Sequence, residues 1–348
     1  MQNFYKWKTV LVTGSTWFKW SWLSFWLNKL WAKVIGYGLE PNTSPDLFSV
    51  LRLNDKITQI IWDISDYKKL EEVVEQYKPE MIFHLAAQPI VRESYDNPVY
   101  TMNTNVMWTV NIMELIRIKE YIKWWVIITT DKVYENKEWL WPYRENDRLW
   151  WFDPYSSSKA MSELAVESYK KSFLQKTDKK ICVVRAGNVI WWWDWAKDRL
   201  IPDIIRSLQN NENVVLRNPD AVRPWQYVLD ALHWYLIAWM KMFEDDKYQW
   251  AYNFWPDIND TLKVIDIVKQ SIEILWKWGY EVRPEMNQWK HEAWLLLLDN
   301  TKSKTLLWWN PKYNVHDVLI RTLNFYKEYY EWKNMEECAN KEIEAYLW

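Results

Sequence analysis

Apolar runs and amphipathic segments alternate along the first half of this chain. The runs are rich in β-branched residues and cover residues 9–13, 32–37, 57–64, 81–88, 126–130 and 180–185. Between them, apolar residues spaced three and four apart predict helices over 23–30, from 67 onward, over 103–119 and over 154–169. Continuous apolar strands that alternate with helices are typical of a parallel sheet covered on both faces. We therefore predict an α/β fold with a doubly wound parallel sheet.

The first run leads into a turn that resembles a nucleotide-binding loop. Thr13-Gly14-Ser15-Thr16-Trp17-Phe18-Lys19-Trp20 joins the predicted first strand to an amphipathic helix. A dinucleotide fingerprint needs glycines for the tight turn, for close approach to pyrophosphate and for helix–strand packing. Gly14 satisfies the first need, whereas Trp17 and Trp20 stand at the other two positions. The frame indicates the opening of a Rossmann-like domain with an altered phosphate loop.

Other candidate residues follow the later strands. Asp63 and Ile64 end the third predicted strand, where a carboxylate can meet the amino group of an adenine. Asp63 could equally be the N-cap of the helix from residue 67. Ala86 and Ala87 are small enough for a cofactor to approach, and His84 before them is expected to be a core histidine. In open parallel sheets, ligands bind at the carboxyl ends of the strands.

Candidate acid and base groups lie at the fifth predicted strand and on the next helix. Thr130-Asp131-Lys132 ends the strand, and Tyr155 precedes Lys159 by four residues, so both project from one helix face. An ammonium beside a phenol lowers the pKa of the phenol from about 10, which makes a usable base. The Tyr-x-x-x-Lys spacing alone is weak, and its combination with the triplet and the loop makes it specific.

The chain changes character after residue 187. Arg199, Arg217 and Arg223 lie among shorter elements, as in a smaller C-terminal α/β substrate-binding domain, and well-spaced arginines suit a nucleotide pyrophosphate. Surface charge is an equal alternative for them. We expect residues 1–187 to form the cofactor domain, residues 188–332 mainly the substrate domain with segments that return to the first, and residues 333–348 a peripheral helical extension.

Composition excludes several classes of protein. Lys and Arg total 44 against 46 for Asp and Glu, so a nucleic acid or a membrane surface is not expected as a partner. No apolar run approaches the roughly 20 residues needed to span a bilayer. The two cysteines, Cys182 and Cys338, show no metal-ligand spacing, so we expect no metal site, a buried thiol at Cys182 and a reducing, cytoplasmic location.

The chain holds 31 tryptophans and only 5 glycines. Average glycine usage is about 7%, and several tryptophans stand beside strands where turns are expected, among them residues 124–125, 150–151, 191–193, 276 and 278. We infer that most of these positions carried glycine in a parent sequence. The alternative is a tryptophan-rich module that binds glycans or single strands by stacking, but such platforms do not fall selectively on turns.

Together these motifs resemble the extended short-chain dehydrogenase/reductase family, and within it the sugar-nucleotide 4,6-dehydratases. The resemblance covers about residues 5–332 and rests on residues 13–23, 84–88, 130–132, 155–159 and 223–226. Many such dehydratases have Asp-Glu where this chain has Asp131-Lys132, and Asp-Lys is typical of the branch acting on CDP-glucose. The resemblance implies a role in lipopolysaccharide O-antigen or deoxysugar biosynthesis.

The resemblance implies NAD as a tightly bound cofactor and a nucleotide sugar as substrate. Tyr155, helped by Lys159 and Thr130, would deprotonate the C4 hydroxyl while NAD takes the C4 hydride. Lys132 would remove the C5 proton, Asp131 would protonate the leaving C6 hydroxyl, and the hydride would return to C6. The implied cofactor contacts are Gly14, Thr16, Trp17, Phe18, Trp20, Asp63, Ile64, Ala86, Ala87, Gln88, Asn105, Tyr155 and Lys159, and the implied substrate contacts are Asn188, Arg199, Arg217, Arg223 and His291.

Two expectations depend on the tryptophans and on the chemistry. An indole at residue 17 or 20 should fill the phosphate site or displace the helix, because it is much larger than the glycine that the loop needs. Such overpacking typically costs 1–3 kcal/mol. We therefore expect that this chain does not bind NAD, that it is impaired or inactive as an enzyme, and that its fold is destabilised. A sugar-nucleotide 4-epimerase, which lacks the elimination step, is the alternative enzyme, and family members commonly form homodimers through helices.

Overall fold

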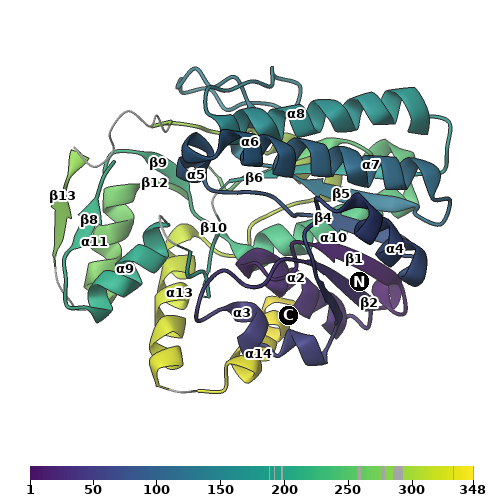
Figure 1. Ribbon diagram of the computed structural model, residues 1–348. Helices are drawn as coiled ribbons and strands as arrows, with labels where there is room; N and C mark the ends of the chain where they lie inside the picture. Colours follow the sequence, from purple (N-terminus) through teal and green to yellow (C-terminus); the bar gives the residue numbers. More distant parts are fainter. Residues whose placement is uncertain are drawn as a thin grey trace.

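The structure is a computed structural model that describes residues 1–187, 189–191, 193–196, 199–257, 260–275, 279–284, 293–331 and 333–347 (Figure 1). Its centre is a seven-stranded sheet in the order β11-β6-β5-β4-β1-β2-β3, in which every pairing is parallel. The strands are β1 (Thr9–Thr13), β2 (Lys33–Gly38), β3 (Thr58–Ile61), β4 (Met81–His84), β5 (Trp124–Ile128), β6 (Lys180–Ala186) and β11 (Ala251–Phe254). The first six follow the order of a dinucleotide-binding sheet, so the predicted Rossmann-like fold is confirmed.

Alternation along the strands creates two hydrophobic layers. Val10 and Val12 face one side of the sheet together with Phe83, whereas Leu11 and Ile82 face the other. Successive strand side chains point to opposite faces, so strands buried on both faces must be apolar throughout. This requirement explains the continuous apolar runs of the sequence.

Helices cover both faces (Figure 1). One layer contains α4 (Tyr67–Tyr77), α7 (Trp108–Ile118) and α8 (Pro154–Tyr169), and the other contains α2 (Phe18–Lys29) and α10 (Val228–Glu244). The helix predicted over 103–119 runs further, as α6 (Pro98–Met102), a π-helical segment η2 (Asn103–Met107) and α7. Shorter helices are α1 (Gln2–Tyr5), α3 (Leu47–Val50), α5 (Val91–Asp96) and α12 (Thr301–Leu307). No helix in the described part of the chain is long and apolar enough to cross a membrane.

A smaller region of short elements lies beyond the carboxyl end of the sheet, at the left of Figure 1. It contains α9 (Leu200–Gln209), α11 (Val264–Leu275), and the two-stranded pairs β7–β10, β9–β12 and β8–β13. The strands are β7 (Val189–Ile190), β8 (Val214–Leu216), β9 (Val222–Pro224), β10 (Gln226–Tyr227), β12 (Thr261–Lys263) and β13 (Tyr280–Val282). The chain returns to the large sheet in α10 and β11, which pairs with β6.

The C-terminal segment packs more closely than its sequence indicated. After α13 (Val315–Tyr330), helix α14 (Met335–Leu347) buries Ala339, Ile343 and Tyr346 in the larger hydrophobic layer. The Tyr346 hydroxyl donates to Asp230 Oδ1 at 2.7 Å, and the Tyr346 ring contacts the ring of Trp26 edge-on. The predicted helix is present, but the expectation that it is peripheral is wrong, because one of its faces completes the core.

Several tryptophans occupy backbone conformations that favour glycine. Trp7, Trp31, Trp193 and Trp308 have φ values of 69°, 64°, 72° and 56°. Trp31 follows the end of α2, where its N–H donates to Asn28 and the Ala32 N–H donates to Leu27, a helix-ending motif usually built on glycine. The expectation that residues 124–125 form a turn is wrong, because both belong to β5 and Trp125 is buried in the core.

The buried indoles add a second kind of strain. The N–H groups of Trp26, Trp125, Trp239, Trp255 and Trp309 have no hydrogen-bond acceptor within the described structure. A buried tryptophan usually finds a partner for its N–H, and leaving such a donor unsatisfied costs about 1–3 kcal/mol. This density of indoles therefore opposes the stability of the fold that the apolar pattern specifies.

Candidate active site

The turn after β1 brings backbone from three strands close together. Gly14 has φ +75°, and a Cβ there would lie 3.0 Å from Ala86 Cα. A Cβ on Gly38, at the end of β2, would lie 3.3 Å from Gly14 Cα. Thr16 is buried, and its hydroxyl donates to the Leu39 carbonyl at 2.7 Å. Glycine at residue 14 is thus required by both conformation and space.

The two loop tryptophans lie at the start of α2. Trp17 is the N-cap, with an extended backbone (φ −78°), and contributes no side-chain cap. Trp20 lies in the first turn, half-buried against the core, and Phe18 is also half-buried. Trp22, Phe25 and Trp26 further along the helix are fully buried against the sheet. Both tryptophans stand where a helix N-terminus would receive a phosphate.

The end of β4 is fixed by hydrogen bonds. His84 contacts Thr13 Oγ1 at 3.0 Å and Thr109 Oγ1 at 3.2 Å, and burial lowers the pKa of this histidine to about 3, with Lys159 adding to the effect. His84 is therefore the neutral core histidine expected from the sequence. Asn105 Oδ1 accepts from the Gln88 backbone N–H at 2.8 Å, and Asn105 Nδ2 donates to Ser158 Oγ at 2.8 Å.

Gln88 and Asn105 hold the site together rather than face open space. Both side chains are buried, and Gln88 Nε2 donates to Thr101 Oγ1 at 2.9 Å. Asn105 lies in the π-helical segment η2, a local widening that often marks functional sites. Ala86 and Ala87 beside them are half-buried, which leaves room at the strand end.

Asp63 is not the helix cap. It lies after β3, where its carboxylate accepts the Ser65 N–H at 2.8 Å, while Asp66 accepts the Lys69 N–H at 3.0 Å and caps α4. The capping alternative for Asp63 is wrong because the helix begins three residues later than that geometry requires. Ile64 is buried beside it.

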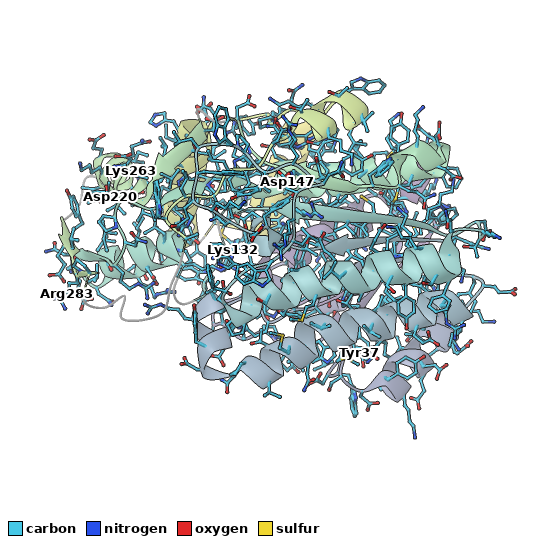
Figure 2. All side chains as sticks on the ribbon, turned by 90° about the horizontal axis from the view of Figure 1, so that it is seen from above. Tyr37, Lys132, Asp147, Asp220, Lys263 and Arg283 are labelled. Carbon is cyan, nitrogen blue, oxygen red and sulfur yellow. The ribbon has the colours of Figure 1, made fainter. Side chains whose placement is uncertain are left out.

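The catalytic candidates meet at the end of β5. Thr130 Oγ1 donates to Asp131 Oδ1 at 2.8 Å, and both residues are buried. Burial raises the pKa of Asp131 above its usual range, while the nearby charges of Lys132 and Arg223 oppose this shift. A carboxyl that retains its proton can act as a general acid. Figure 2 shows Lys132 in the middle of the molecule, between the side that carries Tyr37 and the region of Asp220, Lys263 and Arg283.

Tyr155 and Lys159 lie on the buried face of α8. Asp153 caps this helix by accepting the Ser156 N–H at 2.8 Å, and Pro154 occupies its first turn. Lys159 Nζ donates to the Ile128 carbonyl at 3.2 Å, and burial lowers the pKa of Lys159 to about 8. Burial raises the pKa of Tyr155 to about 12, against a hydrogen bond with Thr130. The expected lowering of the Tyr155 pKa is therefore wrong for this arrangement, because desolvation is the largest effect and outweighs the hydrogen bond with Thr130 and the charge of Arg199.

The smaller region supplies positive charge to the same place. Arg199, the N-cap of α9, acts electrostatically on both Tyr155 and Lys19, and it pairs with Asp194 at 3.0 Å. Arg223 of β9 acts on Asp131. Arg217 directly follows β8, and Asn188 and His291 lie outside the described residues.

Sequence reasoning missed one cation in the loop. Lys19 lies between Phe18 and Trp20, and its Nζ donates to the Tyr235 hydroxyl at 2.6 Å. The ammonium stands over the rings of Trp20 and Tyr235, at 5.0 and 4.8 Å from their centroids. Burial, assisted by Arg199, lowers the pKa of Lys19 to about 7. Its position inside the fingerprint was the available signal.

These residues fit a dinucleotide in part. Gly14 and Gly38 are buried and let the backbone of β1, β2 and the β4 end approach closely at the carboxyl edge of the sheet, where a cofactor binds in such folds, and Ala86 and Ala87 beside them are half-buried. Trp17 and Trp20 occupy the two positions where the fingerprint needs bare backbone. Within the described residues, no group of His, Cys, Asp and Glu is arranged to hold a metal ion.

Comparisons with known proteins agree with this site. A sequence model of the GDP-mannose 4,6 dehydratase family matches residues 11–322. A CDP-glucose 4,6-dehydratase of Salmonella typhimurium (strain LT2) is 41% identical over 352 residues, which cover 99% of this chain and 98% of the relative. The chain is thus a homologue of that enzyme, and the resemblance drawn from the motifs is confirmed.

Solved structures show the same fold. A UDP-glucose 4-epimerase from Thermotoga maritima, in a structure with UDP-glucose, superposes with a TM-score of 0.80 at 23% identity, over 92% of this chain and 99% of the epimerase. A dTDP-glucose 4,6-dehydratase from Bacillus anthracis, in complex with NAD, superposes with a TM-score of 0.77 at 21% identity, over 94% of this chain and 99% of that enzyme. From the family match, the relative and the fold together, this chain belongs to the GDP-mannose 4,6 dehydratase family.

Proposed function

We propose that this chain is built as an NAD-dependent 4,6-dehydratase that converts CDP-glucose to CDP-4-keto-6-deoxyglucose. The observation that carries the proposal is the buried Asp131, with its raised pKa, beside Lys132 and Tyr155 at one strand end. An epimerase needs a base at C4, whereas a dehydratase also needs an acid for the leaving hydroxyl. The Asp-Lys pair supplies that second function, and the 41% identical relative acts on CDP-glucose.

The residues divide the proton transfers between two groups. Tyr155 accepts the C4 hydroxyl proton, with Thr130 bonded to it and Lys159 behind it. Lys132 takes the C5 proton, which is acidic once C4 is a ketone, and Asp131 donates its proton to the departing C6 hydroxyl. NAD, when bound, supplies the acceptor and then the donor of a hydride. Arg199 and Arg223 hold the substrate pyrophosphate.

NAD would be held by the carboxyl edge of the sheet. Gly14, Thr16 and the N-terminus of α2 would receive the pyrophosphate, Asp63 and Ile64 the adenine, and Ala86, Ala87, Tyr155 and Lys159 the nicotinamide end. Trp17 and Trp20 crowd the pyrophosphate position. We infer that they weaken NAD binding and that the chain as it stands has impaired activity.

Product analysis tests the proposal. The purified chain is incubated with NAD and CDP-glucose, and nucleotide sugars are separated and identified by mass spectrometry and NMR. A 4-keto-6-deoxy product supports dehydration, whereas CDP-galactose indicates an epimerase. Absence of any product from both this chain and a Trp17→Gly/Trp20→Gly variant that binds NAD contradicts the assignment.

A companion measurement addresses the tryptophans. Far-UV circular dichroism with a thermal melt, run with and without NAD, reports folding and binding together. We expect a cooperative melt that NAD raises only slightly. Rescue of turnover by glycine at residues 17 and 20 alone would show that the defect is local, and a folded variant that still does not bind NAD would locate the defect in global packing.

We also propose that two copies of the chain pair through α7 and α8. These helices lie side by side on the outer layer (Figure 1), and Met161 and Leu164 on α8 are 45% and 58% exposed. Met107 and Ile118, at the two ends of α7, are also exposed. Light scattering should give a dimer for the unsubstituted chain and a monomer for the Leu164→Glu variant. A nucleotide sugar as substrate, the division into cofactor and substrate regions at residue 187, and a cytoplasmic location belong to the same proposal.

A further inference from the structure

Helix α8 carries a buried acid one turn beyond its candidate base. Tyr155, Lys159 and Glu163 are spaced four residues apart, so they share one helix face. Their exposed fractions are 8%, 6% and 5%. A carboxylate is seldom buried so completely unless it is paired, and the reaction proposed above assigns Glu163 no part.

Glu163 is held by Arg185 of β6. Arg185 Nε donates to Glu163 Oε1 at 3.0 Å and to Oε2 at 2.9 Å, and Nη2 donates to Oε2 as well. The Thr129 hydroxyl donates to Oε1. Both charged side chains are 4% exposed, so water scarcely screens this pair.

The ion pair connects the two halves of the proposed acid–base machinery. Three successive residues at the end of β5 contact α8 through their own partners: Ile128 with Lys159, Thr129 with Glu163 and Thr130 with Tyr155. Arg185 Nη1 also donates to the Tyr134 hydroxyl at 2.6 Å, just beyond the segment that carries Asp131. A shift of Glu163 would therefore move the base, the ammonium and the acid relative to one another.

Titratable groups lie around Lys159 on several elements, and among them the charge that acts on Lys159 is that of Glu163. Glu163 and Tyr155 lie on its own helix, His84 faces it from β4, Asp131 lies at the end of β5, and Arg185 stands behind Glu163 on β6. The carboxylate of Glu163 raises the pKa of Lys159 against the larger lowering effect of burial. His84 is neutral, so the ammonium depends on this carboxylate.

We propose that Glu163, oriented by Arg185, is a positioning residue that keeps Lys159 protonated beside Tyr155. Its catalytic meaning rests on the dehydratase function proposed above, but its effect on Lys159 is a property of the folded chain alone. Arg185 contacts the Glu163 carboxylate directly, whereas Lys159 lies one helix turn away and responds to its charge, so the Arg185 contact sets how much negative charge acts on Lys159.

A purely structural ion pair would behave differently. Breaking it would lower stability, as loss of one partner of a buried pair does, but it would leave the titration of Lys159 unchanged in the molecules that remain folded. The titration of Lys159 therefore separates the two roles.

The test is an NMR titration of the full chain labelled with ¹³Cε lysine, with the Lys159 signal assigned from its loss in Lys159→Arg. In Glu163→Gln, which keeps the shape and removes the charge, we expect the Lys159 pKa to fall by about one unit or more. Glu163→Asp should restore most of the shift. Glu114→Gln, which breaks the exposed Arg117–Glu114 pair on α7, is the matched control and should change nothing.

Arg185→Lys provides an independent arm with the opposite sign. The lysine keeps a positive charge beside Glu163 but donates fewer hydrogen bonds to its carboxylate. More of the negative charge of Glu163 then acts on Lys159, and the pKa of Lys159 should rise. An unchanged Lys159 pKa in Glu163→Gln overturns the proposal. Should that variant fail to fold, an unchanged value in Arg185→Lys overturns it instead.

Activity provides the readout that ties the pair to the reaction. In a chain that turns over CDP-glucose, Glu163→Gln should lower the pH at which the kcat/KM profile levels off by the shift seen in the titration. A chain whose Lys159 responds as expected but which yields no 4-keto-6-deoxy product would refute the dehydratase function and leave the electrostatic role of Glu163 standing.

Discussion

Two strand ends on the same edge of the sheet differ in how they are built. At the end of β5, the candidate acid–base residues and their neighbours form one connected set: Thr130 bonds Asp131, Lys159 bonds Ile128, and Glu163 bonds Arg185 and Thr129. At the end of β1, which β4 separates from β5, the turn contains Gly14. Trp17 is the N-cap of the helix that follows, and Trp20 lies in the first turn of that helix.

The difference shows that the two halves of the site depend on different properties of the chain. In the proposed function, the acid–base half needs particular functional groups, and Thr130, Asp131, Lys132, Tyr155 and Lys159 are the candidates for them. The cofactor half needs small residues and bare backbone, and two large side chains stand there. The proposed function therefore predicts that this chain keeps its candidate catalytic residues while Trp17 and Trp20 weaken the binding of NAD.

The largest effect is expected at the base. Tyr155→Phe removes the group that accepts the C4 proton, and general base catalysis contributes typically 10²–10⁴-fold. We expect turnover to fall by about 10³-fold or more in steady-state assays of product formation, with an unchanged thermal melt. A variant that kept most of its activity would remove Tyr155 from the mechanism.

Replacing the candidate acid, Asp131, should lower turnover less than replacing Tyr155, and it should affect only the elimination step. Asp131→Asn keeps the oxygen that accepts the Thr130 hydroxyl and cannot donate the proton to the C6 hydroxyl. Turnover should fall by about 10²-fold, while exchange of the C5 hydrogen with deuterated solvent continues. Loss of exchange together with turnover would show that Asp131 acts before the elimination.

The pH profile should follow the two pKa values of α8. Because Tyr155 has a pKa of about 12 and Lys159 of about 8, the product of phenolate and ammonium fractions rises about tenfold per unit below pH 8 and levels above it. Lys159→Arg keeps its charge at every accessible pH, so its kcat/KM should continue to rise beyond 8. A profile that levels at the same pH in both chains would exclude Lys159 as the titrating group.

The cofactor turn is the next test of the comparison. Trp17→Gly with Trp20→Gly should lower the Kd for NAD by about tenfold, which corresponds to 1.4 kcal/mol, within the 1–3 kcal/mol typical of overpacking. Isothermal calorimetry measures the change. Trp31→Gly, outside the turn, is the control and should leave the Kd unchanged, and an equal gain there would indicate a global effect.

The smallest effect concerns backbone strain away from the site. Trp308→Gly places glycine at φ 56° and should stabilise the chain by about 1 kcal/mol in urea unfolding, because left-handed conformations cost other residues roughly that amount. Trp141 is similarly exposed, at 72% against 68%, and lies outside the left-handed region. Trp141→Gly should bring no gain, and an equal stabilisation would attribute the effect to loss of an exposed indole.

The sequence by itself determined how strands and helices alternate along the first half of the chain, and it identified the site motifs. Continuous apolar runs can be buried only in a sheet covered on both faces, and the Gly14 turn, the Thr130–Lys132 triplet and the Tyr155–Lys159 spacing each fix local geometry. Residue spacing also showed that Tyr155 and Lys159 share a helix face, since that follows from helical periodicity alone.

Only the tertiary structure decided the environments of those groups. Spacing predicted a lowered pKa for Tyr155, whereas burial between α8 and β5 raises it to about 12, because desolvation depends on residues that are distant in sequence. The pairing of Glu163 with Arg185, the approach of Arg199 and Arg223 to the acid and base, and the burial of α14 all join distant segments. Periodicity reports which face of an element is apolar, but what that face meets is fixed only when the chain has folded.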